Sequence, residues 1–137
     1  MDALTASMAI AASGMRTQGQ RLQVVTENMA NAQSTAETPG ADPYRRKTIS
    51  FKSQLDRARD IETVAVNRIG RDKSDFRLIH DPGHPAANDA GYVKMPNVNS
   101  MVEMMDMREA SRSYEANMNV LQQARTLTSR TIDLLNP

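Results

Sequence analysis

The 137-residue sequence contains no cysteine and no tryptophan, and only two phenylalanines and three tyrosines. Without cysteine, the chain cannot form a disulfide framework, a thiolate nucleophile or a cysteine-based zinc site. The length fits one small domain, or a small domain with long appendages. Hydrophobic residues make up 39% of the chain, but the scarcity of aromatic side chains leaves little bulk for a self-sufficient core. The composition therefore indicates a protein that relies on neighbours.

The sequence also lacks an excess of charge of either sign. Its formal net charge is +1, which argues against bulk electrostatic attraction to nucleic acid or to an anionic membrane as the main function. A basic cluster at 45–47 follows Tyr44. This cluster could bind phosphate or an acidic partner, or form a solvated strand face, and we favour the second interpretation.

No apolar run approaches the roughly 20 residues that a membrane span needs. Residues 3–15 are uncharged and superficially resemble a secretory signal. However, Asp2 stands where such a signal carries positive charge, and Thr5, Ser7 and Ser13 interrupt the apolar stretch. We therefore expect no direct membrane insertion and no cleaved signal peptide.

A long apolar stripe near each end is the strongest positive signal. Steps of four and three residues separate the stripe members, which is the spacing of a coiled-coil seam. The front stripe consists of Leu4, Met8, Ala11, Met15, Leu22, Val25, Met29 and Ala32, with Gln18 as a polar break. The rear stripe consists of Met104, Met107, Tyr114, Met118, Leu121, Ile132 and Leu135, with Ser111, Arg125 and Thr128 as breaks. We predict that all stripe members except Ala11 and Ala32 pack between subunits.

Further apolar residues widen both stripes, namely Ile10, Val24, Val120, Leu127 and Leu134. Two helices that paired only with each other would leave this flank exposed, so we expect several neighbours around each helix. We also hypothesise that the ends of the isolated chain are partly disordered and become helical on assembly.

The patterns predict an α+β fold, in which two long terminal helices form a coiled-coil-like pair and enclose a small β-rich middle insert. The expected segments are an N-terminal helix in 1–33, a loop and β-rich insert in 34–96, and a C-terminal helix in 97–137. The first and last segments together are expected to form one inner helical domain.

Within these segments the local signals are more detailed. The first helix is predicted from Leu4 to about Gln33, and the second from Asn97 or Asn99 to about Leu135, with Ser100 and Glu103 at capping-box spacing. The predicted strands are Tyr44–Phe51, Glu62–Ile69, Phe76–Ile79 and Gly91–Val93. Lys52–Asp60 is ambiguous between helix and loop, and Asp81–Pro85 is predicted to turn.

The sequence offers little support for chemistry. His80 and His84 flank Asp81, but the Pro82-Gly83 turn between them gives no helical spacing that would bring both rings to one metal ion. No nucleophile elbow, phosphate-binding loop or dinucleotide-binding glycine run is present. We therefore expect no catalytic residues, no metal and no cofactor.

A set of motif residues lies in the two terminal parts of the chain, namely Ser13, Gly14, Met15, Gln18, Asn28, Ala30, Asn31, Ala32, Pro96, Asn97, Ser111, Arg112, Tyr114, Ala116 and Asn117. With these motifs the chain resembles the flagellar basal-body rod protein family, and the proximal rod protein C group of that family in particular. Pro43-Tyr44-Arg45 and Gly91-Tyr92-Val93 add to the resemblance, whereas His80 stands where this family leads us to expect tyrosine.

The resemblance implies a structural subunit of the basal-body rod. Such subunits are exported by the flagellar type III apparatus without signal cleavage. They polymerise with copies of themselves and with other rod proteins into a helical tube that crosses the periplasm and carries torque. The alternatives are a coiled-coil adaptor or export chaperone, which the same stripes would serve, and an enzyme, which no motif favours.

Two motif segments invite a physical interpretation. At the expected end of the first helix, the Asn28 and Asn31 side chains could satisfy unpaired carbonyls or adopt the left-handed conformation. These two residues could form a simple helix terminus, and the resemblance adds an inter-subunit role. Arg112 and Glu115, three residues apart, could pair on one helix surface.

Overall fold

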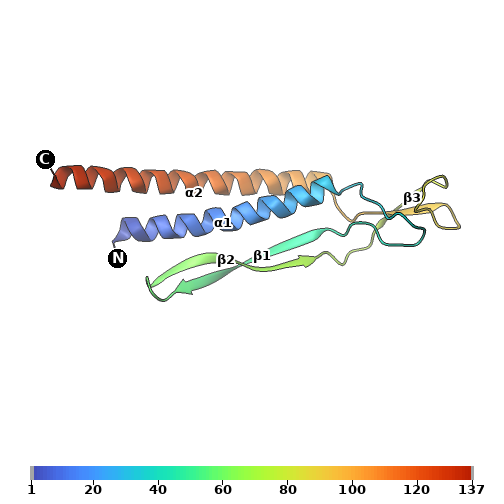
Figure 1. Cartoon of the computed structure of the whole chain (residues 1–137), viewed down its shortest axis with the longest axis horizontal. Helices are drawn as coiled ribbons and strands as arrows, with labels where there is room; N and C mark the ends of the chain where they lie inside the picture. The colour runs from blue at the N-terminus through green and yellow to red at the C-terminus, as the bar shows by residue number, and fades with distance from the viewer. Residues whose placement is uncertain (1, 137) are drawn as a thin grey trace. The chain divides into compact units, whose positions relative to one another are not determined.

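The structure is a computed structural model that describes residues 2–136. In chain order its elements are helix α1 (Ala3–Ala30), strands β1 (Lys47–Asp56), β2 (Ile61–Arg71), β3 (Arg77–His80) and β4 (Tyr92–Met95), and helix α2 (Ser100–Leu135) (Figure 1). Two long helices with small sheets between them confirm the predicted α+β class. None of the helices within residues 2–136 is long and apolar enough to span a membrane.

The contacts divide the chain into two compact units. Unit 1 contains Met1–Leu22, Ser50–Arg68 and Arg108–Pro137, and unit 2 contains Gln23–Ile49 and Ile69–Met107. Each unit therefore combines segments that are far apart in the sequence. The predicted division into 1–33, 34–96 and 97–137 follows chain order instead and stays a prediction.

Helix α1 has a side-chain hydrogen bond at each end. The Asp2 carboxylate Oδ1 accepts the Thr5 backbone N–H at 2.7 Å, as an N-cap residue does. At the other end, Asn31 Nδ2 donates to the Glu27 carbonyl at 2.8 Å, and the Asn31 backbone N–H donates to the same carbonyl at 3.1 Å. This carbonyl has a backbone partner already, so the suggested role of Asn31 in satisfying an unpaired carbonyl stays a prediction. The helix ends at Ala30, three residues before the predicted end.

Helix α2 begins after Asn99, one of the two predicted caps. Asn99 Oδ1 accepts the backbone N–H groups of Met101 at 3.0 Å and Val102 at 3.4 Å. The predicted capping box of Ser100 and Glu103 was wrong. The Glu103 carboxylate is fully buried and bonds side chains of unit 2 instead.

Strands β1 and β2 pair as a two-stranded sheet, and the short connection 57–60 makes them an antiparallel hairpin. Asp56 Oδ1 accepts the N–H groups of Ala58 at 3.1 Å and Arg59 at 3.3 Å. Asp60 has φ of 52°, in the left-handed region that aspartate tolerates. The stretch left ambiguous between helix and loop is therefore the end of β1 and a tight turn, and both strands are longer than predicted.

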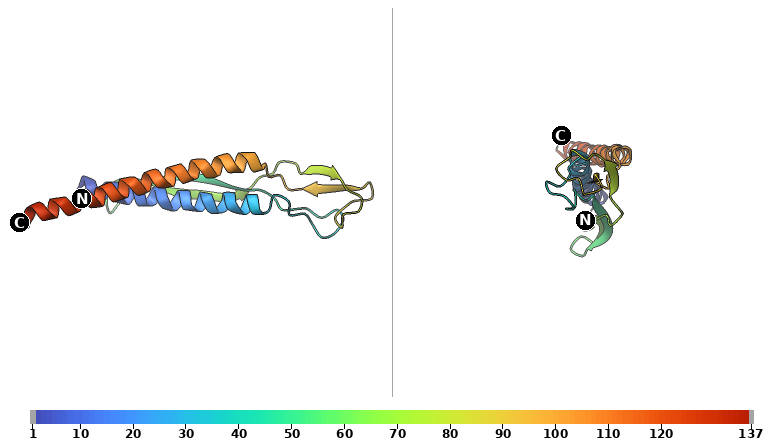
Figure 2. Two further views of the ribbon diagram at one scale, coloured as in Figure 1. Left: turned by 90° about the horizontal axis from the view of Figure 1, so that it is seen from above. Right: turned by 90° about the vertical axis from the view of Figure 1, so that its right-hand side faces the viewer.

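Strands β3 and β4 form a second, separate antiparallel sheet in unit 2, with Arg77 opposite Met95 and His80 opposite Tyr92 (Figure 2). Gly91 precedes β4 with φ of +83°, and a Cβ there would lie 3.0 Å from His80 Nε2. The core beside this sheet is small and consists of Ala86, Val93 and Met95, with Ala36 and Ala87 packed against it. The segment Asp81–Pro85 forms turns, as predicted, and it begins the connection 81–91 between the two strands.

Candidate assembly interface

The helices of unit 1 approach each other through small side chains. Gly14 of α1 lies against Asn117 of α2, and a Cβ at position 14 would be only 2.7 Å from Asn117 Oδ1. Ala11 is 2% exposed on α1, and Ala110 and Ala124 are 0% and 4% exposed on α2. The structure thus brings together two of the predicted motif residues, Gly14 and Asn117, and gives the glycine a steric reason.

The buried line on α2 differs from the predicted stripe by one residue. Ala110, Asn117 and Ala124 are seven residues apart and are buried or half-buried, whereas the sequence pattern assigned Ser111, Met118 and Arg125 to the same turns. The predicted rear stripe followed larger side chains such as Tyr114 and Met118 and so passed over Ala110, Asn117 and Ala124.

The predicted packing residues fall into three groups. Val25 is buried, at 3% exposure, and the half-buried members are Leu4, Met8, Met15, Leu22, Met29, Met107, Tyr114, Met118 and Leu121. The exposed members are Met104, Ile132 and Leu135. Exposure of these apolar side chains in the single chain leaves them available to neighbours, so their role between subunits stays a prediction.

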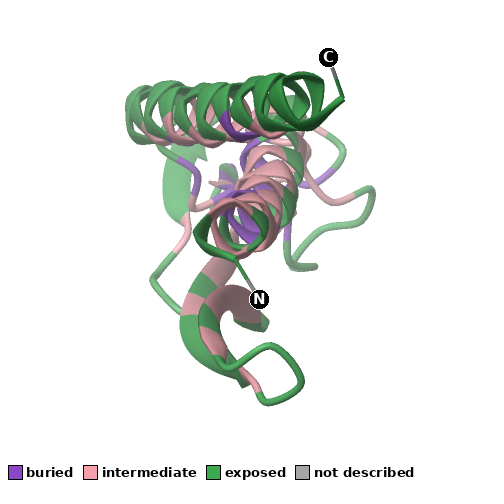
Figure 3. Ribbon diagram, turned by 90° about the vertical axis from the view of Figure 1, so that its left-hand side faces the viewer, coloured by how far each residue is buried: buried purple, intermediate pink, exposed green. Residues whose placement is uncertain are grey.

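The apolar residues that were predicted to widen the two stripes are mostly exposed, with one exception. Ile10, Val120, Leu127 and Leu134 are between 43% and 83% exposed. Val24, which we expected to be exposed in a simple helix pair, is only 5% exposed. In Figure 3 the C-terminal turns of α2 are coloured as exposed.

Ser13 connects α1 to the hairpin of unit 1. Its hydroxyl donates to the Ile10 carbonyl at 2.7 Å and accepts the Val64 backbone N–H at 3.3 Å. Thr17 donates to the Gly14 carbonyl at 2.9 Å. Gln18 places its Oε1 in a buried position that has no hydrogen-bond partner among the described residues. Serine at position 13 therefore has a structural reason of its own.

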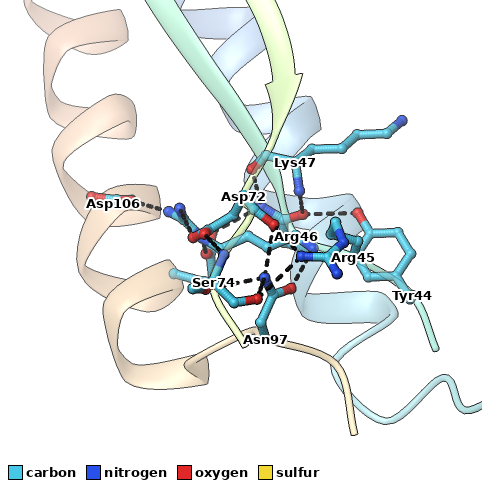
Figure 4. A network of polar contacts seen from close by, with 10 residues as sticks. Tyr44, Arg45, Arg46, Lys47, Asp72, Ser74, Asn97 and Asp106 are labelled. Carbon is cyan, nitrogen blue, oxygen red and sulfur yellow. Dashed lines mark hydrogen bonds and ion pairs between the residues drawn. The ribbon is translucent and has the colours of Figure 1, made fainter. Parts of the chain in front are cut away.

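A network of ion pairs surrounds Arg46 in unit 2 (Figure 4). Its Nε donates to Glu103 Oε1, and its two terminal nitrogens lie 3.4 Å from Asp72 Oδ2 and 3.7 Å from Asp106 Oδ2. The Glu103 side chain is 0% exposed and that of Arg46 is 23% exposed. An acid buried to this degree requires a paired cation, because an unpaired buried charge is strongly unfavourable.

Burial and the neighbouring acidic groups act on the pKa of Arg46 in opposite directions. Burial lowers the pKa of Arg46, but the hydrogen bond and charge of Glu103, with those of Asp72, outweigh burial and raise it above its usual value. The pKa of Asp72 is lowered, first by hydrogen bonds from Ser74 and then by the charge of Arg46. Both groups are therefore held in their charged forms.

Asn28 lies in the last turn of α1, at the expected end of the helix, and its amide bonds several groups of the same unit. Its Oδ1 accepts the Lys47 N–H and the Tyr44 hydroxyl, each at 2.8 Å, and its Nδ2 donates to the Lys47 carbonyl at 2.9 Å. Nδ2 also lies 3.4 Å from Glu103 Oε2. Asn28 thus pairs with the backbone of Lys47 as a neighbouring strand would.

Asn97 completes the network from the segment before α2. Its Oδ1 accepts the Arg46 N–H at 2.8 Å, and its Nδ2 donates to the Asp72 carbonyl at 2.9 Å and to Ser74 Oγ at 3.1 Å. The motif residue Asn97 is therefore a structural link within unit 2, and it does not cap α2.

The basic cluster is half-buried and each of its cations has a partner within the fold, so the prediction of a solvated strand face was wrong. Arg45 donates to the Asp72 carbonyl at 2.8 Å, and its guanidinium lies 4.2 Å from the centre of the Phe76 ring. Lys47 Nζ lies 2.5 Å from Glu27 Oε2. Each cation has a partner that is distant in sequence, which local patterning could not reveal.

The remaining motif residues differ in burial. Ala32 and Pro96 are buried, Asn31 and Ser111 are half-buried, and Ala30, Arg112 and Ala116 are exposed. No ion pair between Arg112 and Glu115 is found in the described part of the chain. Tyr114 lies 4.0 Å from the position of a Cβ on Gly19.

The two histidines make contacts in and beside the turn between β3 and β4. His84 Nδ1 accepts the Ala86 N–H at 3.0 Å, and its Nε2 lies 3.3 Å from Thr35 Oγ1. The His80 ring packs edge-on against Tyr92, with ring centres 5.0 Å apart. Within residues 2–136, no group of three or more histidine or acidic side chains is placed to hold a metal ion.

Comparison with known proteins identifies the family. The family model described as "Flagellar basal body rod FlgEFG protein C-terminal" matches residues 89–134. The flagellar basal-body rod protein FlgC of Agrobacterium fabrum is 56% identical over 135 residues, which cover 98% of this chain and 97% of the relative. The FlgC proteins of Yersinia enterocolitica and Escherichia coli O6:H1 are 41% and 38% identical over 125 residues, covering 91% of this chain and 92% of each relative.

These relatives are structural proteins and not enzymes, so the chain is a structural protein, as predicted. More specifically, it belongs to the FlgC family of flagellar basal-body rod proteins. Family membership implies assembly with other components of the basal-body rod.

Proposed function

We propose that this chain is a rod subunit that polymerises, with copies of itself and with other rod proteins, through its terminal helices. The shaft that results carries torque across the periplasm. The observation that carries the proposal is the similarity to rod proteins along 98% of the chain. The exposed apolar side chains of α2 support it, because Ile132, Leu134 and Leu135 are 53%, 83% and 75% exposed in the single chain.

The proposal includes a coiled-coil-like pairing of the two helices. Two observations support it in unit 1. The buried and half-buried residues Ala110, Asn117 and Ala124 keep heptad spacing on α2, and Gly14 on α1 permits close approach to Asn117. The proposed export route is the flagellar type III apparatus, with the N-terminal helix retained.

The experiment uses a strain in which the native gene is deleted and replaced by variants. Replacing Leu22 or Leu121 with aspartate is expected to abolish motility and incorporation into basal bodies, because each is a half-buried stripe residue. Lys52→Ala is the matched control, since Lys52 is exposed on β1. Intact mass measurement of the incorporated subunit tests whether its N-terminal segment is retained. Normal incorporation of both aspartate variants would contradict the proposal.

A further inference from the structure

A groove in unit 1 has apolar walls and a basic rim. Its volume is about 660 Å³, and its apolar lining includes Met8, Ala12, Leu121 and Ile132. Arg16 of α1 and Arg125 of α2 are part of the same lining, which contains no acidic residue. An occupant that fits this groove must therefore combine apolar side chains with negative charge.

The two arginines are available to such an occupant. Both are exposed, and neither takes part in an ion pair among residues 2–136. A third arginine of the lining, Arg59, pairs with Asp56 at 3.5 Å within its own turn. The positive charges of Arg16 and Arg125 therefore have no acidic partner among the described residues.

The last turn of α2 has the complementary character. Leu134 and Leu135 are the two most exposed large apolar side chains that the structure describes, at 83% and 75%. Asp133 precedes them and is exposed as well. An acidic residue near a helix C-terminus is unfavourable, because the negative end of the helix dipole lies there. No basic residue occurs in this turn, so a cation from outside would relieve the cost.

We propose that the groove binds the C-terminal turn of α2 from a second copy of this chain. Leu134 and Leu135 enter between the apolar walls, and Asp133 faces Arg16 and Arg125. The inference rests on the proposed function, since it names the surfaces through which one copy contacts the next. Groove and turn are different surfaces, so the contact is heterologous. Each added copy therefore leaves one groove and one turn free for growth without closure.

The absence of native cysteine makes the contact directly testable. Ala12→Cys and Leu135→Cys are introduced as single substitutions in two co-expressed copies, and isolated basal bodies are oxidised. We expect a disulfide-linked dimer that contains one copy of each variant, because a disulfide forms only when the Cα atoms lie within about 7 Å. Lys52→Cys paired with Leu135→Cys is the matched control, and its dimer is expected to be at least tenfold weaker.

Charge substitutions test the recognition itself. Asp133→Arg, or Arg16→Asp together with Arg125→Asp, is expected to lower the cross-linked fraction at least fivefold. Combining them reverses both partners and should return the fraction to within twofold of the original. The cysteine result with unaltered charges remains decisive if a charge variant fails to fold.

Three results would overturn the groove assignment: equal cross-linking at Lys52, no effect of the charge substitutions, or capture of a different rod protein by Leu135→Cys. In each case the chain itself is still incorporated into basal bodies, so its proposed function survives. Failure of the unsubstituted chain to enter basal bodies would overturn the proposed function instead.

Discussion

Unit 2 buries charged and amide side chains, whereas unit 1 buries mainly small ones. In unit 2 a fully buried Glu103 meets Arg46, and Asn28 bonds the backbone of Lys47. In unit 1 Gly14 lies against Asn117, Ala110 and Ala124 are buried, and several large apolar side chains remain exposed. Buried hydrogen bonds and ion pairs form only when their partners lie in one geometry. Small buried side chains instead permit two helices to approach closely. Exposed apolar side chains occur in both units, since Met101 and Met105 of unit 2 are each 68% exposed. The two units therefore differ in what they bury.

The most damaging change should be loss of the Arg46 cation. Arg46→Met leaves Glu103 buried without its partner, and breaking such a pair costs about 3–5 kcal/mol. We expect amide exchange in unit 2 to accelerate accordingly, which hydrogen-exchange mass spectrometry measures segment by segment. The double variant Arg46→Met with Glu103→Gln is the control, since removing both charges should recover much of the loss. Unchanged amide exchange in Arg46→Met would show that the buried ion pair does not stabilise unit 2.

Replacing Asn28 should have the next largest effect. Asn28→Ala removes the two hydrogen bonds to the Lys47 backbone and the one from Tyr44, at an expected cost of about 1–3 kcal/mol. Urea unfolding followed by circular dichroism measures the change. Asn31→Ala loses the bond to the Glu27 carbonyl and the one from the Ser34 hydroxyl and serves as the milder control. Equal effects of the two substitutions would show that Asn28 is an ordinary helix-end residue.

A pair of glycine substitutions tests unit 1. Gly14→Ala places a Cβ 2.7 Å from the amide of Asn117, which is the end of a flexible side chain and can rotate away. The amide then loses its hydrogen bond to the Ser113 carbonyl. We expect a net destabilisation of about 0–1 kcal/mol, because the helical preference for alanine offsets part of this loss. At Gly19 the nearest atom, on Tyr114, is 4.0 Å away, so Gly19→Ala should stabilise by about 0.5–1 kcal/mol. Thermal unfolding of both variants decides, and stabilisation by both would mean that the contact at position 14 is loose.

The smallest expected effect is a dependence of stability on acid, to which Asp2 of unit 1 and Glu27 and Asp72 of unit 2 contribute through lowered pKa values. Hydrogen bonding and the charge of Lys47 lower the pKa of Glu27, and hydrogen bonds from Ser74 lower that of Asp72. A lowered pKa in the folded state adds stability above the unfolded value of about 4, and that stability is lost as the pH falls through the folded value. The urea midpoint should be flat from pH 5 to about 8 and fall below about pH 4. Lys47→Met should weaken this fall, and an unchanged profile would count against the assignment.

The elements were largely predictable from sequence because helix and strand periodicity is local. Caps and turns were partly predictable, and Asn99 was one of two candidates. The one-residue offset of the α2 seam was missed, since Ala110 and Asn117 carry little hydrophobic signal. The polar network was missed for another reason. Arg46 and Glu103 are 57 positions apart, and no pattern within a window links an arginine in a basic cluster to a glutamate that resembles a capping residue.

The long separation between the partners in unit 2 has a kinetic consequence. Asn28 and Glu103 are 75 positions apart, so their contact requires a large loop to close first. Contacts between distant positions slow folding, because the chain loses conformational entropy before the contact contributes favourable energy. A chain that emerges from its N-terminus first holds Arg46 without its buried carboxylate until three quarters of the polypeptide is available. Folding of this unit is thereby delayed until most of the molecule has been delivered.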